Sequence, residues 1–122
     1  MTHRWILLVA VALFAGTAVK AQDPTKVDPK HYKVEFENDQ VRVLRVHYGP
    51  HEKSVMHSHP DSVAVFLTDA QGKFTFSDGK SSDVNSKAGD VQWSTATKHL
   101  PEDTSDKPFD VIVIELKSKP AK

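Results

Sequence analysis

The sequence contains no cysteine among its 122 residues, and this absence excludes several kinds of protein. It rules out disulfide bonds, a cysteine nucleophile and the lipid-bearing cysteine of a bacterial lipoprotein. A chain without disulfides depends for its stability on a packed core or on a bound metal ion.

The chain also lacks an excess of either charge, because 16 basic residues balance 16 acidic ones. Without residues 1–21, Arg4 and Lys20 are lost, which leaves 14 basic against 16 acidic residues and a net charge of −2. Such a surface has no basic patch for nucleic acid, so we expect no nucleic-acid partner.

The start of the chain is hydrophobic, but the hydrophobic run is too short for a membrane anchor. The other interpretation of such a start is a signal peptide. Arg4 gives a positive start, residues 5–15 are apolar, and small residues lead to Ala21, after which we expect cleavage. The uncharged stretch ends at Val19 after 15 residues, whereas a spanning helix needs roughly 20. The pattern predicts a cleavable N-terminal signal peptide over residues 1–21. The protein would then be exported, periplasmic or extracellular, with no membrane association after cleavage.

The remaining residues are enough for one domain. Residues 22–30 contain two prolines and no periodicity, so we expect a flexible lead-in. Residues 31–117 are expected to form the folded domain, and residues 118–122 a frayed tail.

No segment of this domain has the 3.6-residue period of a helix, and several alternate with the period of a strand. Residues 31–37 and 41–48 are expected to pair as a hairpin, and Asp78-Gly79 predicts a second hairpin. Short strands separated by Gly, Pro and Asp turns indicate an all-β, antiparallel sandwich or barrel. The other expected elements are strands at residues 62–68, 91–95 and 109–117 and a polar loop at 101–108.

Two histidines, His57 and His59, are separated by one serine. On a strand both side chains point to the same face, so both imidazoles could enter a barrel. His99 is the natural third ligand from another strand. Three neutral imidazoles suit Fe, Mn, Ni, Cu or Zn and leave positions open for water or substrate. The spacing alone leaves an alternative open, since Pro60 and Asp61 also fit an exposed turn.

Other polar residues are expected to lie outside the site. His31 is expected to be solvated, His47 to lie at the surface or barrel mouth, and His51 near a site mouth. Either Gln92 or Trp93 should face the site, because neighbouring strand residues point to opposite faces.

These features resemble a small single-domain cupin over about residues 34–117. Cupins carry two motifs on an antiparallel jelly-roll barrel. The first has a glycine, a His-x-His pair, a glutamate and a second glycine, and Gly49, His57, His59 and Gly72 resemble all of these but the glutamate.

The second cupin motif runs from a glycine through Pro-x-Gly to a histidine, and residues 88–99 resemble it loosely, with Gly89 first. The resemblance implies that His57, His59 and His99 bind a divalent metal ion at one end of the barrel. It also implies a small-molecule ligand or substrate, and pairing into a homodimer.

The chain departs from the cupin pattern at the glutamate, because neither position 63 nor 64 is acidic. We expect Val63 to line the pocket instead. Asp61 is an alternative fourth ligand, although Pro60 breaks its strand parity. Three-histidine cupins include dioxygenases, so the resemblance implies a metal-dependent dioxygenase. A non-catalytic metal or small-molecule binder and a partner-binding barrel without metal are the alternatives.

Overall fold

The computed structural model describes residues 22–118. The expected signal peptide lies outside this range, as do residues 119–122 of the expected tail. Within the described residues, no helix is long and apolar enough to cross a membrane.

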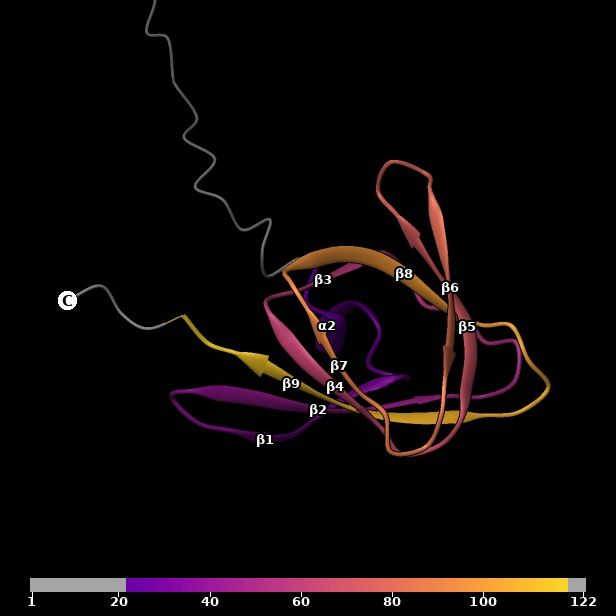
Figure 1. Cartoon of the computed structure of the whole chain (residues 1–122). Helices are drawn as coiled ribbons and strands as arrows, with labels where there is room; N and C mark the ends of the chain where they lie inside the picture. Colours follow the sequence, from indigo (N-terminus) through magenta and orange to yellow (C-terminus); the bar gives the residue numbers. More distant parts are fainter. Residues whose placement is uncertain (1–21, 119–122) are drawn as a thin grey trace, which may run out of the picture.

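Two antiparallel sheets face each other across the interior of the domain (Figure 1). The five-stranded sheet has the order β1-β2-β9-β4-β7, and the four-stranded sheet has the order β3-β8-β5-β6. This arrangement confirms the expected all-β, antiparallel jelly roll. The strands are β1 (Tyr32–Glu37), β2 (Val41–Tyr48), β3 (His57–His59), β4 (Ser62–Phe66), β5 (Ala70–Phe76), β6 (Ser81–Ser86), β7 (Val91–Ser94), β8 (Thr97–Asp103) and β9 (Phe109–Leu116).

Both predicted hairpins are present. β1 pairs with β2 across the turn at residues 38–40, and β5 pairs with β6 across the turn that contains Gly79. Gly79 has a φ of +85°, a backbone conformation that glycine adopts without steric cost.

The core lies between the sheets and follows from alternation along the strands. Leu44, Val46 and Tyr48 point inward from β2, while Phe109 and Val111 point inward from β9. Leu44 is fully buried, and the alternate residues of both strands lie on the outer face.

The segment expected to be a flexible lead-in is instead folded. It forms the short helix α2 (Pro24–Val27), whose N-cap Asp23 accepts a hydrogen bond from the Thr25 amide. Pro24 suits the first turn, because its missing N–H needs no partner there. α2 contacts β1 and β3 (Figure 1), and these contacts order a segment that the prolines alone suggested was loose.

The polar loop expected at residues 101–108 begins later than predicted, because β8 continues to Asp103. Pro101 lies within this strand, opposite Phe74 of β5. The backbones approach closely where Gly72 faces β8, and a Cβ at Gly72 would collide with the Glu102 carbonyl oxygen. The glycine therefore permits the pairing that extends β8.

Candidate metal centre

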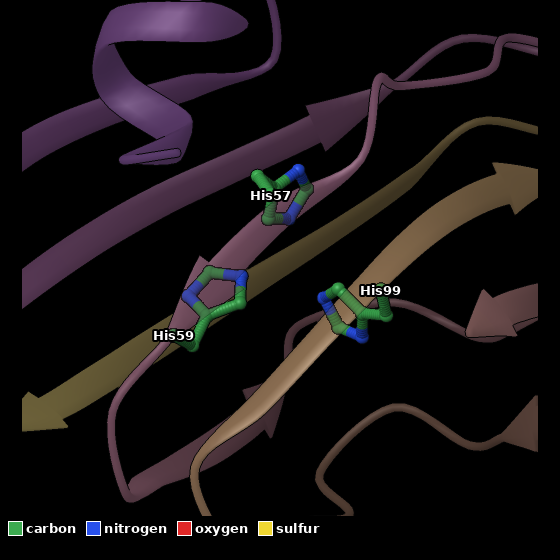
Figure 2. Close-up of side chains that lie close together, drawn as sticks. All are labelled: His57, His59 and His99. Carbon is green, nitrogen blue, oxygen red and sulfur yellow. The ribbon is translucent and has the colours of Figure 1, made fainter. Parts of the chain in front are cut away.

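The three histidines expected in the site lie together on two neighbouring strands (Figure 2). His57 and His59 come from β3, and His99 stands directly opposite His57 on β8. The ring centroids are 4.9 to 5.2 Å apart, and each residue offers a ring nitrogen within 4.8 Å of the others. The side chains converge on one point, as three ligands of one ion must.

The histidine cluster is removed from solvent. His57 is completely buried, and His59 and His99 are 7% and 8% exposed. The Nε2 atoms of His57 and His99 are buried without a hydrogen-bond partner. Leaving a buried polar atom unpaired costs about 1–3 kcal/mol, and an ion bound to these nitrogens would remove that cost. The donor set therefore fits a divalent metal ion.

The backbone beside His57 selects its tautomer. The His57 Nδ1 lies 2.9 Å from the Val55 carbonyl oxygen and 3.3 Å from the Ser54 hydroxyl. A carbonyl oxygen only accepts hydrogen bonds, so Nδ1 carries the proton and Nε2 keeps its lone pair.

A buried carboxylate orients His59 in the same way. The His59 Nδ1 donates to Glu115 Oε2 at 2.7 Å, and Arg42 Nε donates to Glu115 Oε1 at 2.8 Å. A carboxylate behind a histidine fixes the ring and raises its basicity as a ligand. Glu115 thus supports the site without belonging to the three-histidine set.

Sequence reasoning missed Glu115, although its position carried a signal. Phe109, Val111 and Val113 mark the inward face of β9, and Glu115 is the next residue on that face. A carboxylate on an apolar face needs a partner, which makes such a position a candidate for a functional role.

Burial favours the neutral, metal-binding form of two of the histidines. Loss of water lowers the pKa of His57 to about 4, with a further contribution from neighbouring His59. Burial also lowers the pKa of His99 to about 3, helped by the other two imidazoles. Both rings are neutral at physiological pH and available to a metal ion without losing a proton first.

An apolar cavity of about 120 Å³ adjoins the histidines between the two sheets. His59 and His99 line it, together with aromatic and aliphatic side chains that include Phe74, Phe109 and Val111. Its volume suits a small organic molecule rather than a polymer.

The strands at the cavity wall test two expectations from the sequence, one for Gln92 and Trp93 and one for Val63. Gln92 and Trp93 both border the cavity, but their side chains lie on opposite faces of β7. Gln92 lies on the inner face with Ala64 and donates to the Ser86 hydroxyl, whereas Trp93 lies on the outer face with Val63 and is 57% exposed. The expectation for Val63 was wrong, because Ala64 lines the cavity and Val63 pairs with Trp93 on the outer face.

Asp61 does not join the histidines. It is exposed, and its carboxylate accepts a hydrogen bond from the Ala96 amide at 2.8 Å. His47 and His51 also lie outside the cluster, where they pair with Asp110 and Asp106 at the surface.

The expectation that His31 is solvated was wrong. His31 is 6% exposed and stacks on Tyr48 with ring centroids 4.3 Å apart. Its Nδ1 lies 2.8 Å from Asp28 Oδ2. The folding of the lead-in brings Asp28 here and removes His31 from water.

Two facing antiparallel sheets with a histidine cluster at their interior fit the jelly roll that the resemblance to cupins implies. No family model and no curated protein matches the sequence. Solved structures do match, including a cupin domain from Bordetella pertussis Tohama I (24% identity, TM-score 0.66, 71% of this chain and 92% of that chain). A double-stranded β-helix protein from Klebsiella pneumoniae has 20% identity and a TM-score of 0.55 over 72% of this chain and 84% of that one.

A cupin superfamily protein from Desulfitobacterium hafniense is similar at 17% identity and a TM-score of 0.54, over 71% of this chain and 76% of that chain. At these identities the comparisons establish the fold. The chain has the fold of a small single-domain cupin.

The metal-free protein should lose stability as the pH falls from about 6.5 toward 4. His57 and His99 have depressed pKa values in the folded state, so below pH 6.5 the unfolded chain binds more protons and is favoured. His57 alone, with its pKa lowered from 6.5 to about 4, corresponds to a loss on the order of 3 kcal/mol. Urea unfolding in EDTA at pH 7 and pH 4.5 measures the effect.

His99→Gln should reduce this pH dependence, because it removes one of the two buried rings whose pKa is lowered. Equal unfolding free energies at the two pH values in the unmodified protein would contradict the burial argument.

Proposed function

We propose that this protein binds one divalent metal ion, Fe, Mn, Ni, Cu or Zn, through the Nε2 atoms of His57, His59 and His99. The observation that carries the proposal is the pair of buried, unpartnered Nε2 atoms at the centre of the cluster. The depressed pKa values of His57 and His99 add support, because a metal binds only the neutral imidazole.

The reaction that we propose is a dioxygenase-like oxidation of a small, mostly apolar molecule. A divalent iron ion held by three imidazoles keeps coordination positions open and can activate oxygen. His59 and His99 line the cavity, so a molecule within it would lie beside the ligands, and the apolar walls would exclude water.

The alternative function is non-catalytic binding of a metal or small molecule for sensing, storage or scavenging. One observation favours it, since the acid–base groups that border the cavity, apart from the histidines, are already engaged. Glu102 lies on the face of β8 opposite to His99 and pairs with Lys73. Tyr32 lines the cavity, but burial raises its pKa well above the usual value, and its hydroxyl is hydrogen-bonded to Tyr48 at 2.7 Å. Oxygen consumption distinguishes the two functions.

Metal analysis tests whether the three histidines bind a metal ion. Residues 22–122 produced without a histidine tag should retain about one equivalent of metal after dialysis, and His57→Ala/His59→Ala should retain none. The double variant His47→Ala/His51→Ala removes two exposed histidines and is the matched control, expected to bind as the unmodified protein does. The loaded protein would then be screened for oxygen uptake with small acids, thiols and diketones.

Failure of the unmodified protein to bind Fe(II), Mn(II) or Zn(II) on reconstitution would end the metal proposal. Metal binding without oxygen uptake, but with ligand binding in the cavity, would favour the non-catalytic function.

We further propose that residues 1–21 are a signal peptide and that the protein acts in the periplasm or outside the cell. The charge, the apolar run and the small residues before Ala21 support this. The intact mass of protein recovered from the periplasmic or culture fraction should correspond to residues 22–122. A full-length mass in that fraction would contradict cleavage.

A second copy of the chain is the partner that we propose for the outer face of the five-stranded sheet. One apolar row crosses all five strands of this face, because strand register aligns its members from β1 to β7. The row consists of Phe36, Val43, Ile114, Val63 and Trp93. Phe36 and Trp93 are 53% and 57% exposed at its ends, an unusual exposure for large apolar side chains.

This face is suited to self-association, because a symmetric dimer needs the same patch on both copies. Val63→Lys/Trp93→Lys should therefore convert a dimer to a monomer in light scattering coupled to size exclusion. Val55→Lys changes a similarly exposed apolar side chain (48%) beside the four-stranded sheet and is the control. A monomeric unmodified protein at high concentration would contradict the proposal.

A further inference from the structure

Two carboxylates, at the two ends of α2, connect to two different histidines of the site. Asp23 precedes the helix and Asp28 follows it. We propose that residues 22–28, the N-terminal latch, position His57 and His59 and thereby set the affinity of the site for metal. This inference rests on the proposed metal function and extends it to a segment outside the barrel.

The first connection runs from Asp23 to His59. Arg42 donates from two guanidinium nitrogens to the Asp23 carboxylate, at 2.7 and 3.0 Å, and from Nε to Glu115 at 2.8 Å. Glu115, only 3% exposed, in turn accepts from His59. Asp23 thus holds the guanidinium in the one orientation that also serves Glu115.

The charge of Asp23, at the outer end of this path, follows from its contacts. Burial opposes ionisation of Asp23, but hydrogen bonds from Arg42 and Thr25 outweigh it and lower the Asp23 pKa to about 2. Asp23 is therefore a carboxylate at neutral pH. Replacing it with a neutral amide would loosen Arg42, and with it the group that fixes the His59 ring.

The second connection runs from Asp28 to His57. The Ser54 hydroxyl donates to Asp28 Oδ2 at 2.5 Å, so its oxygen is free to accept from His57 Nδ1 at 3.3 Å. Asp28 is itself buried and also holds His31. The far end of the latch is thereby fixed against the core.

The start of the latch binds the strand that carries both ligands. The Ser58 amide donates to the Gln22 carbonyl oxygen at 2.9 Å, and the Ser58 hydroxyl donates to the Gln22 side-chain oxygen at 3.0 Å. β3 has only three residues and lies at the edge of its sheet, paired on one side with β8. The latch supplies contacts on the side that the sheet leaves open.

Positioning residues of this kind should change metal affinity more than they change the fold. Asp23→Asn and Arg42→Lys should each weaken Zn(II) or Co(II) binding about tenfold or more in competition with a chromophoric chelator. Glu35→Gln and Arg45→Lys are matched controls, because this ion pair joins the neighbouring strands β1 and β2 at the surface.

Two readouts separate positioning from general stability. Urea unfolding of each metal-free variant measures the change in stability. Ring nitrogen chemical shifts should show His59 with its proton on Nδ1 in the unmodified protein, and a mixture of tautomers in Asp23→Asn.

Coupling is reciprocal, so metal should also hold the latch in place. In the unmodified protein, Zn(II) should slow trypsin cleavage after the exposed Lys26 of α2 several-fold and leave cleavage after Lys80, in the distant β5–β6 turn, unchanged. His57→Ala/His59→Ala should lose this protection.

The outcomes separate the two proposals. An unmodified protein that binds no metal contradicts the metal centre itself. Metal binding that Asp23→Asn and Arg42→Lys leave unchanged, with no protection of Lys26, overturns the latch alone. Weaker binding in both variants and protection of Lys26 support it.

Discussion

The ion pair between Glu115 and Arg42, with His59 on the other carboxylate oxygen, is the interaction on which the rest of the structure depends. A carboxylate taken out of water is costly unless charge and hydrogen bonds replace the solvent. Here one oxygen receives the His59 Nδ1 proton and the other receives the Arg42 guanidinium. If either partner is displaced, a buried charge is left unsatisfied, so the positions of β2, β3 and β9 are coupled at this point.

That coupling explains why a three-residue strand can carry two ligands. β3 alone has too few backbone hydrogen bonds to fix side chains precisely, and it lies at a sheet edge. β8 pairs with it on one side. Hydrogen bonds of Gln22, Glu115 and Ser54 with the three residues of β3 fix its orientation further. Several elements therefore converge on the two ligands of this short strand.

The strands, the two hairpins and the convergence of His57 with His59 could be predicted because each follows from a local period or turn. The order in which strands pair is not local, so the sequence indicated His99 as the third ligand but could not place it opposite His57. The expectations of a flexible lead-in and of a solvated His31 were wrong for one common reason. Their burial depends on Asp23 and Asp28 meeting Arg42 and Ser54, residues distant in sequence that no local pattern connects.

The absent glutamate of the first cupin motif has a physical consequence. Positions 63 and 64 hold Val and Ala instead of an acid, and the three imidazoles themselves bring no negative charge to an ion. Within the described residues, Glu115 is the acid hydrogen-bonded to a member of the cluster, but Arg42 already offsets its charge. A divalent ion here would keep most of its charge facing a cavity with largely apolar walls. Attraction grows stronger where water is excluded, so such a site favours a small ligand whose own negative group can reach the ion.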